Sequence, residues 1–259
     1  MDLQAGLSSD ERQELIFRII KEQKRIRLTQ ISKSFGISIA TARRDLENLA
    51  KENKVERVHG GAILTRKAPP EMAVQQRQIE QAEEKQRIGR ETAQMISEGE
   101  TVLISNGTTP LEVAKNLVDR ENLTVITNSL PVLCLLANNP KISVICLGGQ
   151  FRNKEAAFIG HITEGNLEEV HADKVIIGTR SLSLVSGLTA DYLSEVMTDR
   201  AILRISSEVI VVADYTKFDR VSTASVAPLS AIQTVVTDDK ASPEFVDGLR
   251  ARGIRVVIV

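Results

Sequence analysis

Residues 80–259 alternate between short apolar stretches and segments in which apolar residues recur at helical spacing. The apolar stretches are four to six residues long, as expected for strands that are buried on both faces. They are Thr101–Ser105, Leu123–Thr127, Ile142–Leu147, Lys174–Gly178, Val209–Ala213, Thr234–Thr237 and Arg255–Ile258. Helical patterns occupy about Glu83–Ser97, Leu111–Val118, Leu130–Ala137, Ser194–Ile205 and Pro243–Ala251. This alternation predicts a largely parallel, doubly wound α/β domain.

A different pattern occupies Gln30–Arg57, which reads QISKSFGISIATARRDLENLAKENKVER. Gly36 provides the backbone freedom for a sharp turn, and Ser38 stands where the N-cap of a second helix should be. The apolar face of that helix consists of Ala42, Leu46, Leu49 and Ala50, and its other face carries Ala40, Thr41, Arg43, Arg44 and Glu47. The order of these features is typical of a helix-turn-helix whose second helix faces the DNA major groove. An ordinary amphipathic helix with a solvated charged face is the alternative.

A hairpin is predicted directly after this helix. In KVERVHGGAIL, residues 54–64, two alternating apolar runs are separated by Gly60 and Gly61. A hairpin in this position makes a winged helix, in which Arg57 and His59 would lie near the DNA backbone. The basic residues at 24–27 are predicted to form a turn that either contacts phosphates or is solvated.

These patterns divide the chain into two predicted domains. A winged helix-turn-helix DNA-binding domain covers residues 8–64 and starts at Ser8 and Glu11, which have the spacing of a capping box. Residues 65–79 are polar, contain Pro69 and Pro70, and are predicted to be a linker. The α/β domain covers residues 80–259 and is predicted to bind a ligand and to mediate oligomerisation.

The charge of the chain follows the same division. Residues 1–67 hold 14 Lys and Arg against 9 Asp and Glu, whereas the remainder holds 19 against 25. The whole chain has a net charge of only −1, so its overall charge says nothing about nucleic acid. A basic N-terminal segment on an acidic body is expected of a DNA-binding head.

Composition limits the remaining classes. The chain has 259 residues, of which 42% are hydrophobic and 26% charged, as in globular proteins. Cys134 and Cys146 each lie in an apolar run, which favours buried free thiols in a reducing cytoplasm over a disulfide or redox pair. The three histidines have no metal-ligand spacing, and no stretch of 18 apolar residues or signal peptide occurs. We therefore expect a cytoplasmic protein without a metal or a membrane span.

Small polar residues follow most of the predicted strands. Open parallel sheets bind ligands beyond the carboxyl ends of their strands, and glycines with hydroxyl residues at a helix start bind anions. The candidate binding residues are Asn106, Gly107, Thr108 and Thr109 after the first strand, Thr127, Asn128 and Ser129 after the second, Gly148, Gly149 and Arg152 after the third, and Asp214 and Lys217 after the fifth. Each loop alone is equally consistent with ordinary turns. Together they predict a phosphorylated, hydroxyl-rich ligand.

The chain resembles the DeoR family of transcriptional regulators over nearly its whole length. The resemblance is carried by FGISIATARRDL and RVHGGA near the N-terminus, and by Asn106–Thr109, Thr127–Ser129, Gly148–Gly149 and Asp214–Lys217. It implies a winged-helix head on a domain similar to ribose-5-phosphate isomerase. It also implies a protein that represses sugar-utilisation genes, responds to a phosphorylated sugar and forms homo-oligomers. It also implies that Ser38, Thr41, Arg43 and Arg44 contact DNA, that Asn106–Thr109 bind phosphate, and that Lys217 contacts the effector.

The chain departs from the family pattern at three positions. Ser105 stands where Asp is common, which puts a sugar contact there in doubt. Ala42 replaces a larger apolar residue, so the packing of its helix is expected to be looser. Tyr215 stands where His is common, which is consistent with a different effector.

The sequence is consistent with three functions. The first is a DNA-binding regulator controlled by a phosphorylated sugar, with no cofactor. The second is a sugar-phosphate isomerase with an appended DNA-binding domain. That reaction needs a general base, but residues 178–181 contain no carboxylate, which leaves Asp191 and Glu195 as weak candidates. The third is a DNA-binding protein without an effector, against which the strand-end loops argue.

Overall fold

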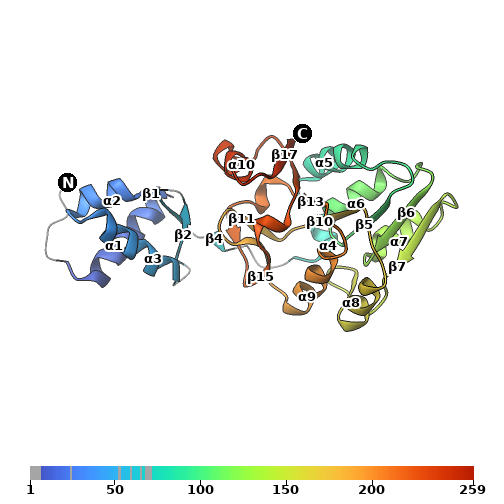
Figure 1. Ribbon diagram of the computed structural model, residues 1–259, viewed down its shortest axis with the longest axis horizontal. Coiled ribbons are helices and arrows are strands. Elements are labelled where there is room, and N and C mark those ends of the chain that lie inside the picture. The colour runs from blue at the N-terminus through green and yellow to red at the C-terminus, as the bar shows by residue number, and fades with distance from the viewer. Residues whose placement is uncertain (1–6, 24, 52–53, 59, 65, 68–71) are drawn as a thin grey trace. The chain divides into compact units, whose positions relative to one another are not determined.

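The computed structural model describes residues 7–23, 25–51, 54–58, 60–64, 66–67 and 72–259. The chain divides into two compact units, Met1–Lys67 and Ala68–Val259. Figure 1 labels the helices and many of the strands of both units. His59, one of the predicted DNA contacts, lies outside the described residues.

The smaller unit is a winged helix-turn-helix. Its helices are α1 (Ser9–Gln23), α2 (Leu28–Phe35) and α3 (Ile39–Lys51), and its strands are β1 (Arg25–Arg27), β2 (Val55–Val58), β3 (Gly61–Leu64) and the short β4 (Arg66–Lys67). Strands β1, β3 and β2 form an antiparallel sheet in that order. Ile16, Ile20, Ile31, Leu46 and Leu49 are at most 1% exposed and form the core. The predicted fold of this part is confirmed.

Two local features of this unit can be compared with their predictions from sequence. The capping box is present, because Ser8 N–H donates to Glu11 Oε2 at 3.0 Å and Glu11 N–H donates to Ser8 Oγ at 3.3 Å. The predicted turn before α2 is instead strand β1, whose middle residue Ile26 is only 2% exposed. One buried apolar residue between exposed arginines is too short a pattern to identify a strand from sequence.

The larger unit is built on a seven-stranded parallel sheet. Its strands are β5 (Thr101–Ile104), β6 (Leu123–Thr127), β7 (Ile142–Cys146), β10 (Lys174–Gly178), β13 (Val209–Val212), β16 (Thr234–Thr237) and β17 (Arg255–Ile258). The order across the sheet is β17-β16-β13-β10-β5-β6-β7. The first strand of this sheet is β5, and β6 and β7 are added on one side of it. The chain then returns to β10 on the other side of β5, and β13, β16 and β17 follow outward from there. The strand order therefore reverses between β5 and β10.

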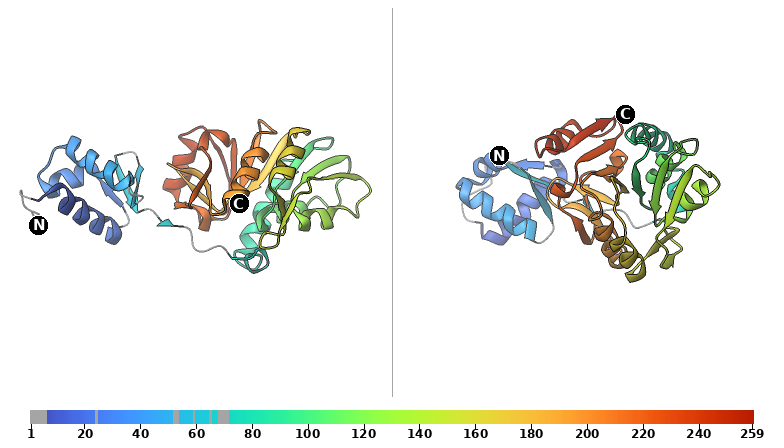
Figure 2. Two further views of the ribbon diagram at one scale, coloured as in Figure 1. Left: turned by 90° about the horizontal axis from the view of Figure 1, so that it is seen from below. Right: turned by 45° about the vertical axis from the view of Figure 1, so that its right-hand side comes forward.

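Helices cover both faces of this sheet. On one face α5 (Ala82–Gln94), α6 (Thr108–Lys115) and α7 (Leu130–Leu136) pack on residues such as Ile104 and Ile176. On the other, α8 (His161–Glu168), α9 (Leu193–Ile202) and α10 (Pro243–Arg250) contribute to a core with Leu103 and Val175. Alternate residues of each strand point to opposite faces, so both faces are apolar. The right-hand view of Figure 2 shows the red α10 and the teal α5 on either side of the strands.

Shorter elements lie between the strands and helices of the larger unit. A hairpin is formed by β8 (Gln150–Arg152) and β9 (Ala157–Ile159), and a three-stranded sheet by β11 (Ser181–Ser183), β12 (Gly187–Ala190) and β15 (Ala224–Ala227). The others are α4 (Val74–Arg77), strand β14 (Arg220–Val221) and the 3-10 helices η1 (Tyr215–Lys217) and η2 (Leu229–Ala231).

Two expectations differ from the structure. Cys134 on α7 and Cys146 on β7 are free thiols, but both are exposed rather than buried. Strand β7 is at the edge of the sheet, and its burial pattern leaves Cys146 open, so an apolar run did not mean burial here. Within the predicted linker at 65–79, α4 is folded onto the larger unit: Val74 is 3% exposed and its N–H donates to Lys154 O at 2.9 Å.

Candidate functional sites

Helix α3 presents a polar face from a well-defined turn. Gly36 closes α2 in the left-handed region, with φ 61°. Ser32 Oγ donates to Ile37 O at 2.6 Å, and Thr41 N–H donates to Ser38 Oγ at 3.1 Å, which makes Ser38 the N-cap that the sequence predicted. Ala42 is fully buried, so the small residue at this position is packed in the core. The exposed face carries Ile39, Ala40, Arg43 and Arg44, while Thr41 is partly buried.

The predicted wing contact Arg57 also belongs to the surface of α3. Its Nη1 lies 2.6 Å from Glu47 Oε1, and both side chains are partly exposed. Glu47 therefore holds the guanidinium beside α3. The Arg57 side chain therefore lies beside the same helix that carries Arg43 and Arg44.

Sequence reasoning missed the residue that anchors α3 from inside. Asp45 is 2% exposed, and its carboxylate accepts two hydrogen bonds from Arg12 on α1, at 2.6 and 2.9 Å. Gln13 Nε2 also donates to it at 3.3 Å. The carboxylate raises the pKa of Arg12, chiefly through the hydrogen bonds. Asp45 thus fixes the rotation of α3 and with it the direction in which Arg43 and Arg44 point.

A cleft in the larger unit opens where the strand order reverses. Its floor comes from the segments after β5 and β10, which is where open α/β sheets bind ligands. The residues that line it are Arg77, Ser105–Pro110, Glu155, Ile177–Arg180, Leu188–Asp191, Glu195, Asp199, Lys217 and Val226. Of the candidate residues predicted from sequence, Asn106, Gly107, Thr108, Thr109 and Lys217 are brought together here.

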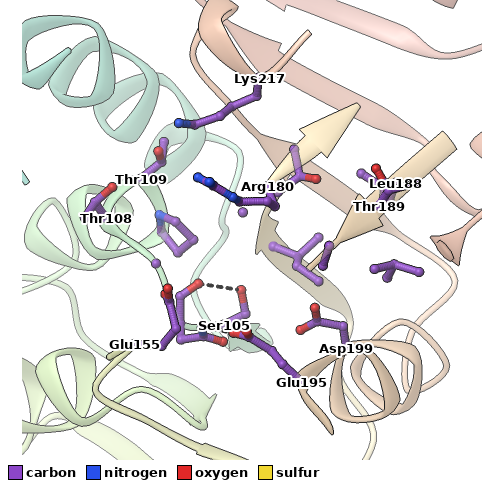
Figure 3. Close-up of a pocket in the computed structure, with 18 of the residues that line it drawn as sticks. Ser105, Thr108, Thr109, Glu155, Arg180, Leu188, Thr189, Glu195, Asp199 and Lys217 are labelled. Carbon is purple, nitrogen blue, oxygen red and sulfur yellow. Dashed lines mark hydrogen bonds between the residues drawn. The ribbon is translucent and has the colours of Figure 1, made fainter. Parts of the chain in front are cut away.

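One end of the cleft can bind an anion. Gly107, with φ 126°, turns the chain so that α6 begins at Thr108 with its first backbone N–H groups toward the cleft. The Thr108 and Thr109 hydroxyls have no hydrogen-bond partner among the residues that the structure describes. Figure 3 shows the side chains of Lys217 and Arg180 reaching toward the start of α6. Amides, hydroxyls and two cations converging in this way are the chemistry of a phosphate site.

The opposite end of the cleft is acidic. Glu155, Glu195 and Asp199 gather there, below Arg180 in Figure 3. Glu155 forms an ion pair with Arg77, and Glu195 forms one with Arg152. Glu195 also accepts a hydrogen bond from Asn106 Nδ2 at 2.9 Å, which links the two ends of the cleft. A ligand that fills the cleft would therefore meet cations at one end and carboxyl groups at the other.

Burial perturbs several charged groups around the cleft. Desolvation lowers the pKa of Lys217, and the nearby Asp214 carboxylate acts in the opposite direction. Desolvation also lowers the pKa of Lys85 to about 8; its ammonium donates to the carbonyl groups of Arg77 and Glu80. The pKa of Asp199 is raised well above its usual value, first by desolvation and then by the charges of Glu195 and Glu155. Such shifts are common at binding sites because clefts remove charges from water.

Seven of the predicted effector residues lie outside the lining and support it. Asn128 accepts a hydrogen bond from Asn106 N–H at 3.1 Å and donates to Asn106 Oδ1 at 3.2 Å, which fixes the loop that starts α6. Arg152 holds Glu195 and stacks on Tyr192, with its guanidinium carbon 4.1 Å from the ring centre. These two residues shape the cleft through their neighbours.

The other five have structural contacts of their own. Thr127 Oγ1 donates to Ile104 O at 2.7 Å, and Ser129 caps α7 by accepting from Val132 N–H. Gly148 accepts from the Thr163 hydroxyl, and Gly149 lies next to it with no room for a larger side chain. Asp214 is fully buried, caps η1, and has its Oδ2 3.9 Å from Lys217 Nζ. Asp214 therefore positions Lys217 in the cleft wall.

Several lining residues were not among the predicted ones. Arg180 comes two residues after Gly178, the last residue of the fourth predicted strand. Its position after a strand was therefore the signal that could have identified it. Arg77 falls in the predicted linker, and Glu155 and Asp199 follow no strand of the main sheet, so the sequence offered no comparable signal for them. Asp191 and Glu195, which the isomerase hypothesis considered, do line the cleft.

The comparisons with known proteins agree with this architecture. The family model for the DeoR C terminal sensor domain matches residues 80–239, and the model for the DeoR-like helix-turn-helix domain matches residues 12–68. The chain belongs to the DeoR family of transcriptional regulators. It is accordingly a DNA-binding transcriptional regulator with a sensor domain.

Relatives within the DeoR family match nearly end to end. The transcriptional repressor AccR of Agrobacterium fabrum is 34% identical over 89% of this chain and 90% of its own length. The glycerol-3-phosphate regulon repressor of Escherichia coli is 33% identical over 90% of this chain and 92% of its own. Ribose-5-phosphate isomerase A from Neisseria gonorrhoeae aligns with 52% of each chain at 15% identity and a TM-score of 0.38, which supports no functional conclusion.

In the described part of the chain, no helix combines the length and the apolar character needed to cross a bilayer. Among the same residues, no group of three or more His, Cys, Asp or Glu side chains is arranged to hold a metal ion, the acidic end of the cleft included.

Proposed function

We propose that this DeoR-family regulator represses genes of carbohydrate metabolism and that a phosphorylated sugar or polyol, bound in the cleft, controls its binding to DNA. The observation that carries the proposal is the anion-binding end of the cleft at the start of α6, where Thr108, Thr109, Arg180 and Lys217 converge. The carboxyl groups at the other end of the cleft suit a ligand that also carries hydrogen-bond donors.

The relatives support the same class of ligand. One is named for the glycerol-3-phosphate regulon and another as a putative repressor of the aga operon, both in Escherichia coli. Neither name identifies the ligand of this chain. Both names describe repressors of a particular set of genes, and the cations and hydroxyl groups at the start of α6 support an effector that carries an anionic group.

The DNA-binding half of the proposal rests on the exposed face of α3. Arg43 and Arg44 would contact phosphates or guanine, while Thr41 and Ser38 at the start of the helix would contact the backbone or base edges. Arg57 lies beside α3 and would add a backbone contact. Since one arginine–guanine pair contributes roughly 1–3 kcal/mol, specificity is expected to need two heads on a two-fold operator, and so a homo-oligomer.

One experiment tests both halves. Operator binding by the full chain is measured with a panel of phosphorylated sugars and the same sugars without phosphate. We expect only phosphorylated compounds to change operator affinity. Lys217→Met should weaken the effective compound about tenfold or more, because a charge-assisted hydrogen bond is lost, and should leave operator binding without ligand intact.

Matched variants complete the design. Arg43→Ala with Arg44→Ala should abolish operator binding and preserve ligand binding, whereas Arg18→Ala on α1 should change neither. Lys141→Met, an exposed lysine outside the cleft, is the control for Lys217→Met. Unchanged operator affinity in the double arginine variant would refute the DNA-binding assignment. A panel in which free sugars act as well as their phosphates would refute the ligand class.

A further inference from the structure

The acidic end of the cleft has one carboxyl group more than it has cations. Glu155 is paired with Arg77, and Glu195 with Arg152. Asp191 is paired with Arg180, with its Oδ2 3.3 Å from Arg180 Nε. Asp199 has no ion pair or hydrogen bond through its carboxyl group among the residues that the structure describes. It is the one acid in the lining that the protein itself leaves without a partner, within that described part.

Asp199 is nevertheless held firmly in the wall of the cleft. It lies on α9 four residues after Glu195, so both side chains project from the same face of the helix. The following turn packs into the core through Ile202, which is fully buried. Figure 3 shows Asp199 beside Glu195 at the end of the cleft away from Lys217. Its carboxyl group is partly buried, and an ionised carboxyl in this place is costly unless a cation joins it.

The two ends of the cleft therefore call for opposite charges. The start of α6, Lys217 and Arg180 suit a phosphate, and the acidic end holds three carboxyl groups beside two arginines. We propose that Asp199 is a specificity-determining residue that binds a protonated amino group, so that the effector is a phosphorylated amine such as an amino sugar phosphate. This inference rests on the proposed function and narrows its ligand class. An ammonium group would form an ion pair with the ionised Asp199 and lie close to Glu195, whereas beside a hydroxyl the Asp199 carboxyl would keep its proton and form no ion pair.

Matched pairs of ligands test the inference on the full chain. Calorimetry at pH 7 compares glucosamine 6-phosphate with glucose 6-phosphate, and galactosamine 6-phosphate with galactose 6-phosphate. We expect the amino member of at least one pair to bind about tenfold more tightly than its neutral partner. Asp199→Asn keeps the shape and hydrogen-bonding capacity of the side chain but removes its charge, and should bring that ratio close to one. Affinity for the neutral member should change much less.

Two controls make the result specific. Asp247→Asn changes an exposed carboxylate on α10, whose side chain is 76% exposed, and should leave the ratio as in the unmodified chain. Asp199→Ser serves as a second variant if Asp199→Asn lowers the melting temperature, and should also remove the preference.

The outcomes separate this inference from the proposed function. Equal affinities within each pair, a preference for the neutral member, or a preference that survives in Asp199→Asn would overturn the role of Asp199 while leaving a phosphorylated sugar as the effector. Binding only of other, neutral sugar phosphates would do the same. If no phosphorylated compound binds, both the proposed function and this inference fail.

Discussion

Asp45 illustrates at the residue scale how a buried charge can serve an exposed surface. Its carboxylate and the Arg12 guanidinium are 2% and 14% exposed, so each depends on the other for charge compensation. We predict that Asp45→Ala lowers the free energy of unfolding of the small unit by roughly 3 kcal/mol, because a mostly buried guanidinium loses its partner. Hydrogen exchange of α1 and α3 amides measures this directly, and both helices should exchange faster.

Asp10→Ala is the matched control for this prediction, since Asp10 is an exposed acid in the first turn of α1. It should leave exchange in α3 unchanged. Equal protection of α3 in Asp45→Ala and in the unmodified chain would show that Asp45 does not anchor the helix. Operator affinity should fall with Asp45→Ala even though the residue faces away from the exposed side.

The residues of α3 also show what the sequence could and could not predict. Helical periodicity was enough to place Ala42, Leu46 and Leu49 inside and Arg43 and Arg44 outside. It could not find the partner of Asp45, because Arg12 lies 33 positions away and nothing in either segment names the other. The same limit applies to the cleft, where Asn106–Thr109 followed from a strand-end rule while Glu155 and Asp199 come from elements that the rule does not cover.

At the scale of elements, the wing depends on one close contact between strands. A Cβ added to Gly61 would lie 2.1 Å from Ile26 O, so β3 can lie beside β1 only if residue 61 is glycine. We predict that Gly61→Ala separates β1 from β3 and destabilises the small unit by about 1–3 kcal/mol, as overpacking does. The Ile26 and Arg27 region should lose hydrogen-exchange protection, and operator binding should weaken.

Gly60→Ala is the control for the wing. Gly60 has φ 82°, but a Cβ there would meet no atom within 4 Å. Its cost should be limited to the left-handed backbone conformation, about 1 kcal/mol, with β1 still paired to β3. If the two variants behaved alike, backbone conformation rather than the β1–β3 contact would explain the need for glycine.

The regular elements were the predictable ones. The seven strands of the main sheet and helices α5, α6, α7, α9 and α10 lie within about three residues of their expected bounds, because buried parallel strands and amphipathic helices have strong patterns. Helix α8 was not predicted. The hairpin β8–β9, the sheet β11-β12-β15 and helix α4 are built from elements of three or four residues, which are too short to show a period in the sequence. Helix α4 carries Arg77, and β12 and β15 carry Leu188–Ala190 and Val226, so this part of the cleft lining was not predicted.

At the scale of the whole molecule, DNA recognition and ligand binding belong to different units. The exposed face of α3 lies in residues 1–67, and every residue that lines the cleft lies in residues 68–259. A ligand can control DNA binding only if it binds more tightly to one conformation of the chain than to another. The coupling between the sites is therefore a free energy, and it acts equally in both directions.

This reciprocity yields a prediction that needs no knowledge of the conformations. If the effector lowers operator affinity by some factor, saturating operator must lower effector affinity by the same factor, and a tenfold effect corresponds to about 1.4 kcal/mol. We expect a factor between about 5 and 150, the usual range for such coupling.

Calorimetric titration of the effector into the full chain, with and without saturating operator, gives one ratio of affinities, and operator titrations with and without effector give the other. A DNA duplex of unrelated sequence at the same concentration serves as the control, because it separates operator recognition from general electrostatic binding. Effector affinity that stays constant while the operator is bound would mean that the cleft does not regulate α3, whatever ligand it holds.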